Sequence, residues 1–186
     1  MPEHVILFAG PMGAGKTTAI RALSDIPVVG TEAVNTERHV VDKPTTTVAL
    51  DYGELTIGDD EKLRLYGVPG QRRFAFMWRI LQGRAEGLVV LVAAGDPDPV
   101  GSMLACLTDF GDLAARGGVV VGITRTDSVA APLDACARAL AREHPELVVP
   151  LFTVDPRDPG QMVVVLMTLL ANLEMRERLE PREVLA

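Results

Sequence analysis

One stretch near the beginning of the chain combines residue types and spacing that suit the binding of phosphate groups. Residues 10–17 read Gly-Pro-Met-Gly-Ala-Gly-Lys-Thr and fit the pattern G-x-x-x-x-G-K-[ST]. A loop of this composition can aim several backbone N–H groups at one anion, because glycine adopts the positive φ angles that such a turn needs. We expect positive φ at Gly10 and Gly15, and a close approach of the backbone to phosphate at Gly13.

The side chains of this loop predict that the anion is the polyphosphate of a nucleotide with Mg²⁺ bound to it. Lys16 would reach the β- and γ-phosphates, which makes it a binding and a catalytic candidate, and Thr17 would place its hydroxyl on Mg²⁺. The helix that follows would point the positive end of its dipole at the same site. The predicted nucleotide-contacting residues of this stretch are Gly10, Met12, Gly13, Ala14, Gly15, Lys16, Thr17 and Thr18.

A second candidate segment, Thr124-Arg125-Thr126-Asp127, follows an apolar run far downstream. The carboxylate of Asp127 could accept hydrogen bonds from the N1–H and 2-amino groups of guanine, whereas adenine offers neither donor in that arrangement. Arg125 could lay its stem and planar head on the face of the base. The segment resembles the base-reading motif [NT]-K-x-D of Ras-like GTPases, with Arg125 in the place of Lys. The resemblance implies that Thr124, Arg125 and Asp127 favour GTP and GDP over ATP.

The elements that must position these segments follow from hydrophobic periodicity and turn signals. Strands are expected at 5–9, 47–57, 63–66, 88–92, 119–123 and 147–152. Helices are expected at 18–23, 74–81, 100–113, 132–140 and 158–178, the last with Asp158 as its cap. The predicted fold class is α/β, with three layers and a six-stranded, mostly parallel sheet that includes one antiparallel strand. Ligands of such sheets bind outside the carboxyl ends of the strands, where all the candidate segments fall.

Length and composition restrict the classes of protein. The 186 residues predict one domain, with a core over about 4–176 and a short tail over 177–186. A net charge of −7 without a Lys/Arg cluster disfavours nucleic-acid binding and a polybasic membrane anchor. Cys106 and Cys136 have no metal-ligand spacing and are interpreted as buried apolar residues, so we expect a cytoplasmic protein. Residues 28–47 show no period and are interpreted as a functional loop beside the phosphate site.

The order of these segments resembles that of Ras-like P-loop small GTPases. Within that superfamily the chain is similar to bacterial conservon-type GTP-binding proteins and to Mgl-type gliding-motility GTPases. The resemblance implies a switch that binds GTP and slowly hydrolyses it to GDP, with Mg²⁺ as cofactor. It also implies a roadblock-type regulatory protein and a switch-reading effector as partners. The residues that carry it are 10–18, 24–27, 31–33, 45–53, 67–78 and 154–158.

The same resemblance assigns roles to the segment 67–71, which is similar to the D-x-x-G-Q pattern of the superfamily. The N–H of Gly70 would bond the γ-phosphate, and Gln71 would orient the attacking water as a catalytic residue. Gly67 stands where most relatives carry the Asp that helps to hold Mg²⁺. Without that Asp, either Mg²⁺ strengthens nucleotide binding less than it does in those relatives, or another carboxylate helps to hold Mg²⁺ instead.

The remaining implied site residues come from two loops. Thr47 would contact the γ-phosphate and Mg²⁺, with Thr45 and Thr46 as adjacent alternatives. Val154 and Asp155 stand where the family has its last base-contacting loop, although the sequence there departs from the family pattern.

Several features bear on the rate of hydrolysis and on partners. Met12 stands where many relatives have Gly, so its side chain would crowd the γ-phosphate and slow turnover. An arginine for catalysis could come from Arg38, Arg72 or Arg73, each of which could equally be a solvated surface charge. Phe76 and Ile80 lie outside the core-facing stripe of their helix. They either form an exposed surface for a partner protein or are buried under a neighbouring loop.

Two alternative functions remain open. One is a nucleotide-binding module that does not hydrolyse its ligand, and the other is an ATP-dependent small-molecule kinase.

Overall fold

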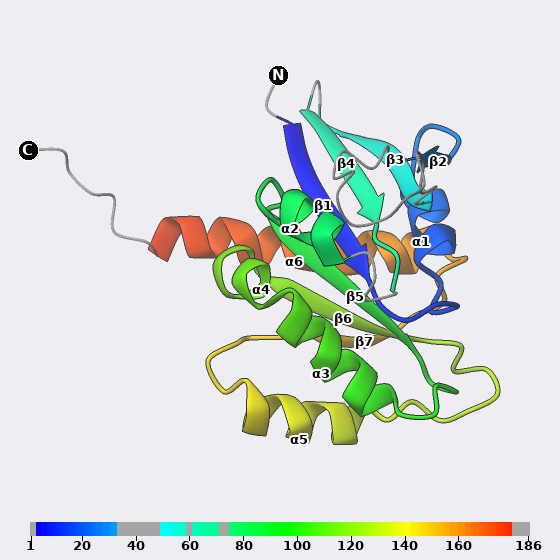
Figure 1. The fold of residues 1–186 in the computed structure, drawn as a ribbon, viewed down its shortest axis with the longest axis vertical. Coiled ribbons are helices and arrows are strands. Elements are labelled where there is room, and N and C mark those ends of the chain that lie inside the picture. Colours follow the sequence, from blue (N-terminus) through cyan, green and yellow to red (C-terminus); the bar gives the residue numbers. More distant parts are fainter. Residues whose placement is uncertain (1–2, 33–48, 59–60, 71–74, 180–186) are drawn as a thin grey trace, which may run out of the picture.

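The computed structural model describes residues 3–32, 49–58, 61–70 and 75–179, which form a mixed β-sheet flanked by helices (Figure 1). The strands are β1 (Glu3–Ala9), β2 (Val29–Glu32), β3 (Ala49–Ile57), β4 (Glu61–Gly67), β5 (Gly87–Ala93), β6 (Val119–Thr124) and β7 (Leu151–Thr153). The helices are α1 (Lys16–Leu23), α2 (Ala75–Gln82), α3 (Pro99–Asp109), α4 (Gly111–Gly117), α5 (Leu133–Glu143) and α6 (Pro159–Leu179).

The described residues contribute seven strands to the sheet, in the order β2-β3-β4-β1-β5-β6-β7. β1 pairs in parallel with β4 and β5, and β6 and β7 continue the parallel half. β3 runs antiparallel to both of its neighbours, β2 and β4. The predicted α/β class and the one antiparallel strand are confirmed, whereas the predicted number of six strands is wrong.

β2 is the strand that the sequence pattern did not predict, and it occupies an edge of the sheet in the segment interpreted as an irregular loop. Among the described residues it pairs with β3 alone, from Val29 opposite Tyr52 to Glu32 opposite Ala49. A short edge strand is held by backbone hydrogen bonds on one side, so its sequence, Val-Gly-Thr-Glu, needs no apolar alternation. Residues 33–48, the rest of the expected loop, lie outside the described part of the chain.

Helices cover both faces of the sheet, so that the fold has three layers (Figure 1). On one face, α1 and α6 pack against strand residues such as Phe8 and Val89. On the other face, α2, α3, α4 and α5 enclose a second core that includes Trp78 and Phe110. β6 is buried along its whole length and β5 along all but its last residue, as their continuous apolar runs predict.

Two elements differ from the predicted ones for local reasons. The helix expected over 100–113 is two helices, because Phe110 leaves the helical conformation (φ −113°, ψ 26°) and its side chain is buried in the core. The strand expected from residue 147 begins only at Leu151. Pro150 precedes it, and its carbonyl accepts a hydrogen bond from the N–H of Val121, but proline has no N–H to extend the ladder.

The amino end of α6 is built as the sequence predicts. Asp158 Oδ1 accepts the backbone N–H groups of Gly160 and Gln161 at 2.9 and 3.3 Å, and the amide of Gln161 donates back to Asp158 Oδ2 at 2.9 Å. This reciprocal cap fixes the start of the helix beside the last strand. None of the helices in the described residues has the length and apolar content that a membrane span requires.

Candidate functional site

The predicted phosphate loop connects the carboxyl end of β1 to the start of α1. Gly10, Gly13 and Gly15 all have positive φ, at 139°, 81° and 99°, which confirms the prediction for Gly10 and Gly15. A Cβ on Gly10 would lie 2.0 Å from the carbonyl oxygen of Leu91, so no other residue fits there. The loop is therefore pressed against β5 and leads into α1 with the amino end of that helix beside it.

Lys16 lies inside the curve of the loop. Its Nζ donates to the carbonyl oxygens of Gly10 and Pro11, both at 2.8 Å. Burial lowers the pKa of this ammonium group, and the electrostatic influence of Cys106 and Asp51 opposes that shift. An ammonium that is partly desolvated in this way would gain from a phosphate oxygen as an additional partner. Met12, in contrast, is 85% exposed at the tip of the loop.

The segment after β4 lies against the phosphate loop. A Cβ on Gly70 would be 2.5 Å from the carbonyl oxygen of Gly10, so the backbone of Gly70 approaches the loop as closely as its lack of a side chain allows. Trp78 on α2 donates from Nε1 to the carbonyl of Pro69 at 3.1 Å. These residues line a cavity of about 250 Å³ that also borders α3. Gln71, the predicted catalytic residue, lies outside the described residues.

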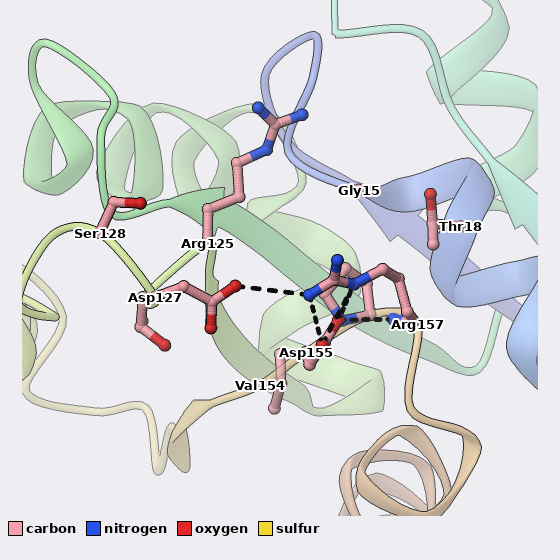
Figure 2. Close-up of a pocket in the computed structure, with 10 residues that line it drawn as sticks. Gly15, Thr18, Arg125, Asp127, Ser128, Val154, Asp155 and Arg157 are labelled. Carbon is pink, nitrogen blue, oxygen red and sulfur yellow. Dashed lines mark hydrogen bonds and ion pairs between the residues drawn. The ribbon is translucent and has the colours of Figure 1, made fainter.

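The predicted base-reading segment begins at the carboxyl end of β6, next to the same loop. Thr124 is fully buried, and its hydroxyl lies 2.9 Å from the carbonyl oxygen of Ala14 and 3.4 Å from that of Val92. Arg125 has a positive φ of 57°, and its guanidinium extends toward Gly13, 3.9 Å from where a Cβ on that glycine would lie. Figure 2 shows Arg125 extended toward the phosphate loop, whereas the carboxylate of Asp127 faces Arg157.

A cavity of about 370 Å³ joins the end of the phosphate loop to the two downstream segments (Figure 2). A volume of this size falls within the range of small-molecule sites. Six of the predicted nucleotide-binding residues line this cavity, although they lie up to 140 positions apart in the sequence. The lining residues are Gly15, Thr18, Arg125, Thr126, Asp127, Ser128, Val154, Asp155, Pro156 and Arg157.

Arg157 is a lining residue to which the sequence analysis gave no role. Its Nη2 contacts Asp155 Oδ2 at 2.8 Å and Asp127 Oδ2 at 3.4 Å, so it bridges the two carboxylates across the cavity (Figure 2). The guanidinium holds the pKa of Asp155 below its usual range. Asp127 is still 79% exposed in its side chain and can reach a ligand. No periodicity or motif spacing in the sequence marks an arginine in this position.

Val154 and Asp155 lie beside the cavity, but their backbone N–H groups already have partners. The N–H of Val154 donates to the carbonyl of Ile123, and that of Asp155 donates to Oε1 of Gln161, both at 2.9 Å. A nucleotide base could use the N–H of Asp155 only if Gln161 released it. The predicted contact of Val154 and Asp155 with the base stays a prediction.

Two side-chain oxygen atoms that could help to bind Mg²⁺ lie close together at the start of α1. The hydroxyl of Thr17, a predicted metal ligand, donates to Asp51 Oδ2 on β3 at 2.5 Å. Mg²⁺ is usually bound by one or two protein oxygens together with phosphates and water, so these residues fit it. The described part of the chain contains no group of three or more His, Cys, Asp or Glu residues arranged to hold a metal by themselves. Thr47, the other predicted ligand, lies outside it.

Comparisons with known proteins agree with the phosphate-loop part of the site. A family described as "Conserved hypothetical ATP binding protein" matches residues 8–95, slightly less than half of the chain. The curated protein "Uncharacterized protein MJ1339" of Methanocaldococcus jannaschii is 38% identical over 93 residues, which cover 50% of this chain. The chain spans about half, 53%, of the length of that relative. The geometry of the glycine loop and the partial match to this family together indicate a nucleotide-binding P-loop protein with an α/β fold.

Proposed function

We propose that the chain binds guanine nucleotides and acts as a molecular switch that slowly hydrolyses GTP to GDP. The observation that carries this proposal is the single cavity that joins the end of the phosphate loop, Gly15 and Thr18, to the carboxylate of Asp127. A nucleotide with its phosphates in the loop would extend its base into that cavity. There it would meet an exposed carboxylate that can accept the two guanine donors.

The word ATP in the description of the matching family does not decide the base. The match covers residues 8–95, which include the loop that would hold the phosphates but end well before Asp127. Phosphates are common to ATP and GTP, so this part of the chain cannot distinguish them. The choice depends on residues 124–127, and there the carboxylate favours guanine.

The groups around the loop support a role in hydrolysis. Lys16 already lies in the curve of the loop and would bind the β- and γ-phosphates. The backbone of Gly70 lies against the same loop, and its N–H would bond the γ-phosphate. Gln71 follows Gly70 directly and would orient the attacking water. Mg²⁺, when bound, would neutralise charge on the phosphate oxygens, and Thr17 and Thr47 would help to hold it. Met12 would slow the reaction by crowding the γ-phosphate.

A switch needs a surface whose shape follows the nucleotide, and α2 is the candidate. Ile80 on this helix is 66% exposed, as its position off the core-facing stripe predicts. An exposed apolar side chain on the helix that contacts Pro69 through Trp78 suits a surface that a partner protein reads. We propose a Ras-like switch in the cytoplasm, regulated by a roadblock-type protein and read by an effector.

Asp127→Asn tests the nucleotide directly. Loss of the charged acceptor should weaken GDP binding by about 10- to 150-fold, the equivalent of one charge-assisted hydrogen bond. Binding of xanthosine diphosphate should become tighter, because xanthine carries a carbonyl at C2 that can accept from the new amide. Isothermal titration calorimetry with the two nucleotides measures both changes.

Asp134→Asn is the matched control, since Asp134 is an exposed Asp on α5 outside the cavity. It should leave both affinities unchanged. Unchanged GDP affinity in Asp127→Asn would contradict the proposed recognition of guanine.

A non-hydrolysing binding module is the second candidate, favoured by Met12 at the tip of the loop and by the absence of a carboxyl side chain at Gly67. Single-turnover release of phosphate from bound GTP separates the two functions. Slow release that disappears in Gln71→Ala supports a GTPase, whereas GTP that stays intact over many hours supports the binding module.

A further inference from the structure

Gly67 and Asp51 lie directly opposite each other on neighbouring strands. They are register partners in the antiparallel pair of β3 and β4. A Cβ on Gly67 would lie 3.0 Å from Cβ and 3.0 Å from Oδ2 of Asp51, and 3.0 Å from Cδ1 of Ile20. The carboxyl group of Asp51 therefore occupies space that a side chain at position 67 would need. Position 67 is the one at which the D-x-x-G-Q pattern has its Asp.

The carboxylate of Asp51 is directed at the metal-binding candidate of the phosphate loop. Its Oδ2 accepts the hydroxyl proton of Thr17 at 2.5 Å. A hydroxyl whose proton is held in this way presents its oxygen lone pairs to a cation. The contact with Thr17 places one negative charge at the end of the loop where Mg²⁺ would bind.

We propose that Asp51 on β3 is the carboxylate that couples Mg²⁺ to the bound nucleotide, in the place of the Asp missing at position 67. This inference rests on the proposed function, because it concerns the metal that accompanies the nucleotide. Asp51 acts through Thr17 and is in this sense a positioning residue. Gly67 is then required for a physical reason: without a side chain at 67, the carboxyl group of Asp51 fits against α1.

The coupling between Mg²⁺ and nucleotide is measurable without turnover. We define it as the ratio of the GDP dissociation constants in EDTA and in excess Mg²⁺, each measured by calorimetry. In the parent chain this ratio should be well above one. Asp51→Asn keeps an acceptor for Thr17 but loses the charge, so the affinity in Mg²⁺ should fall relative to that in EDTA and the ratio should decrease by about tenfold.

Two further variants give the test its control and its rescue. Glu54→Gln removes one negative charge from the same strand, where Glu54 pairs with Tyr52 and Lys62 instead of the loop, and it should leave the ratio unchanged. Asp51→Ala combined with Gly67→Asp moves the carboxylate across to β4 and should restore most of the coupling that Asp51→Ala loses. Circular dichroism of each variant establishes that it is folded.

The outcomes separate this inference from the proposed function. Wild-type coupling in folded Asp51→Asn, or a parent chain that binds GDP equally well in EDTA and in Mg²⁺, would overturn the role of Asp51 and leave guanine binding intact. A parent chain that binds GDP in neither buffer would overturn the proposed function, and the role of Asp51 with it.

Discussion

Thr124 shows how one buried hydroxyl holds two parts of the site together. It lies at the end of β6, is fully buried, and donates to the carbonyl of Ala14 in the phosphate loop, 110 positions earlier in the chain. A buried carbonyl without a donor is costly, so this contact sets where the proposed base-reading segment lies relative to the loop. The sequence marks Thr124 only as part of a short motif and gives no reason for this contact.

Thr124→Val should therefore destabilise the fold and weaken nucleotide binding. Valine has nearly the same shape as threonine but cannot donate, so the free energy of unfolding should fall by about 1–3 kcal/mol. Urea unfolding followed by circular dichroism measures the change. Thr124→Ser keeps the donor and serves as the control; equal losses in the two variants would show that packing of the methyl group, and not the hydrogen bond, carries the effect.

Arg157 and Asp51 show what a single sequence cannot predict at this scale. The pattern of glycines and the Lys-Thr pair is local, so the phosphate loop can be predicted from spacing alone. The bridge from Arg157 to Asp127 and the contact of Asp51 with Thr17 join residues 30 and 34 positions apart. Such contacts depend on strand register and on loop positions, which no local pattern encodes.

Helix α2 links the Gly70 segment to the core through one side chain. Trp78 is 5% exposed, packs against Phe110 with ring centroids 5.3 Å apart, and holds the carbonyl of Pro69 through its indole N–H. Pro69 precedes Gly70, whose N–H we propose to bond the γ-phosphate. A change in the position of Gly70 would therefore reach the indole through one residue.

The fluorescence of Trp78 should follow the nucleotide state, and it is the only tryptophan in the chain. Replacing GDP by a non-hydrolysable GTP analogue should alter the indole hydrogen bond and shift the emission intensity or maximum. Trp78→Phe should bind both nucleotides and show no such signal. Identical spectra of the parent chain in the two states would contradict the link from Gly70 to α2.

The elements differ in how well periodicity predicts them. β5 and β6 are covered on both faces, so their sequences had to be apolar throughout and were recognisable. Within the described part of the chain β2 has a neighbour on one side only, and the break at Phe110 depends on how that ring packs in the core. Features set by tertiary packing or by one-sided backbone pairing leave little trace in the local sequence.

Over the whole molecule, topology gathers segments from three distant parts of the chain at one edge of the sheet. The carboxyl ends of β1, β4 and β6 place the phosphate loop, the Gly70 segment and Asp127 around two cavities. This arrangement could be predicted from sequence, because parallel strands in α/β sheets end at a common edge. A guanine site and an adenine site differ in the side chains that face the base, which we propose are those of residues 124–127.

Calorimetric titration of the purified chain with GDP and with ADP, in the same Mg²⁺ buffer, tests the central claim most directly. The two ligands share their phosphates and sugar, so any difference in affinity comes from the base. GDP should bind at least about a hundredfold more tightly than ADP, since adenine leaves the carboxylate of Asp127 without its two donors. Equal affinities, or tighter binding of ADP, would contradict a guanine-specific site.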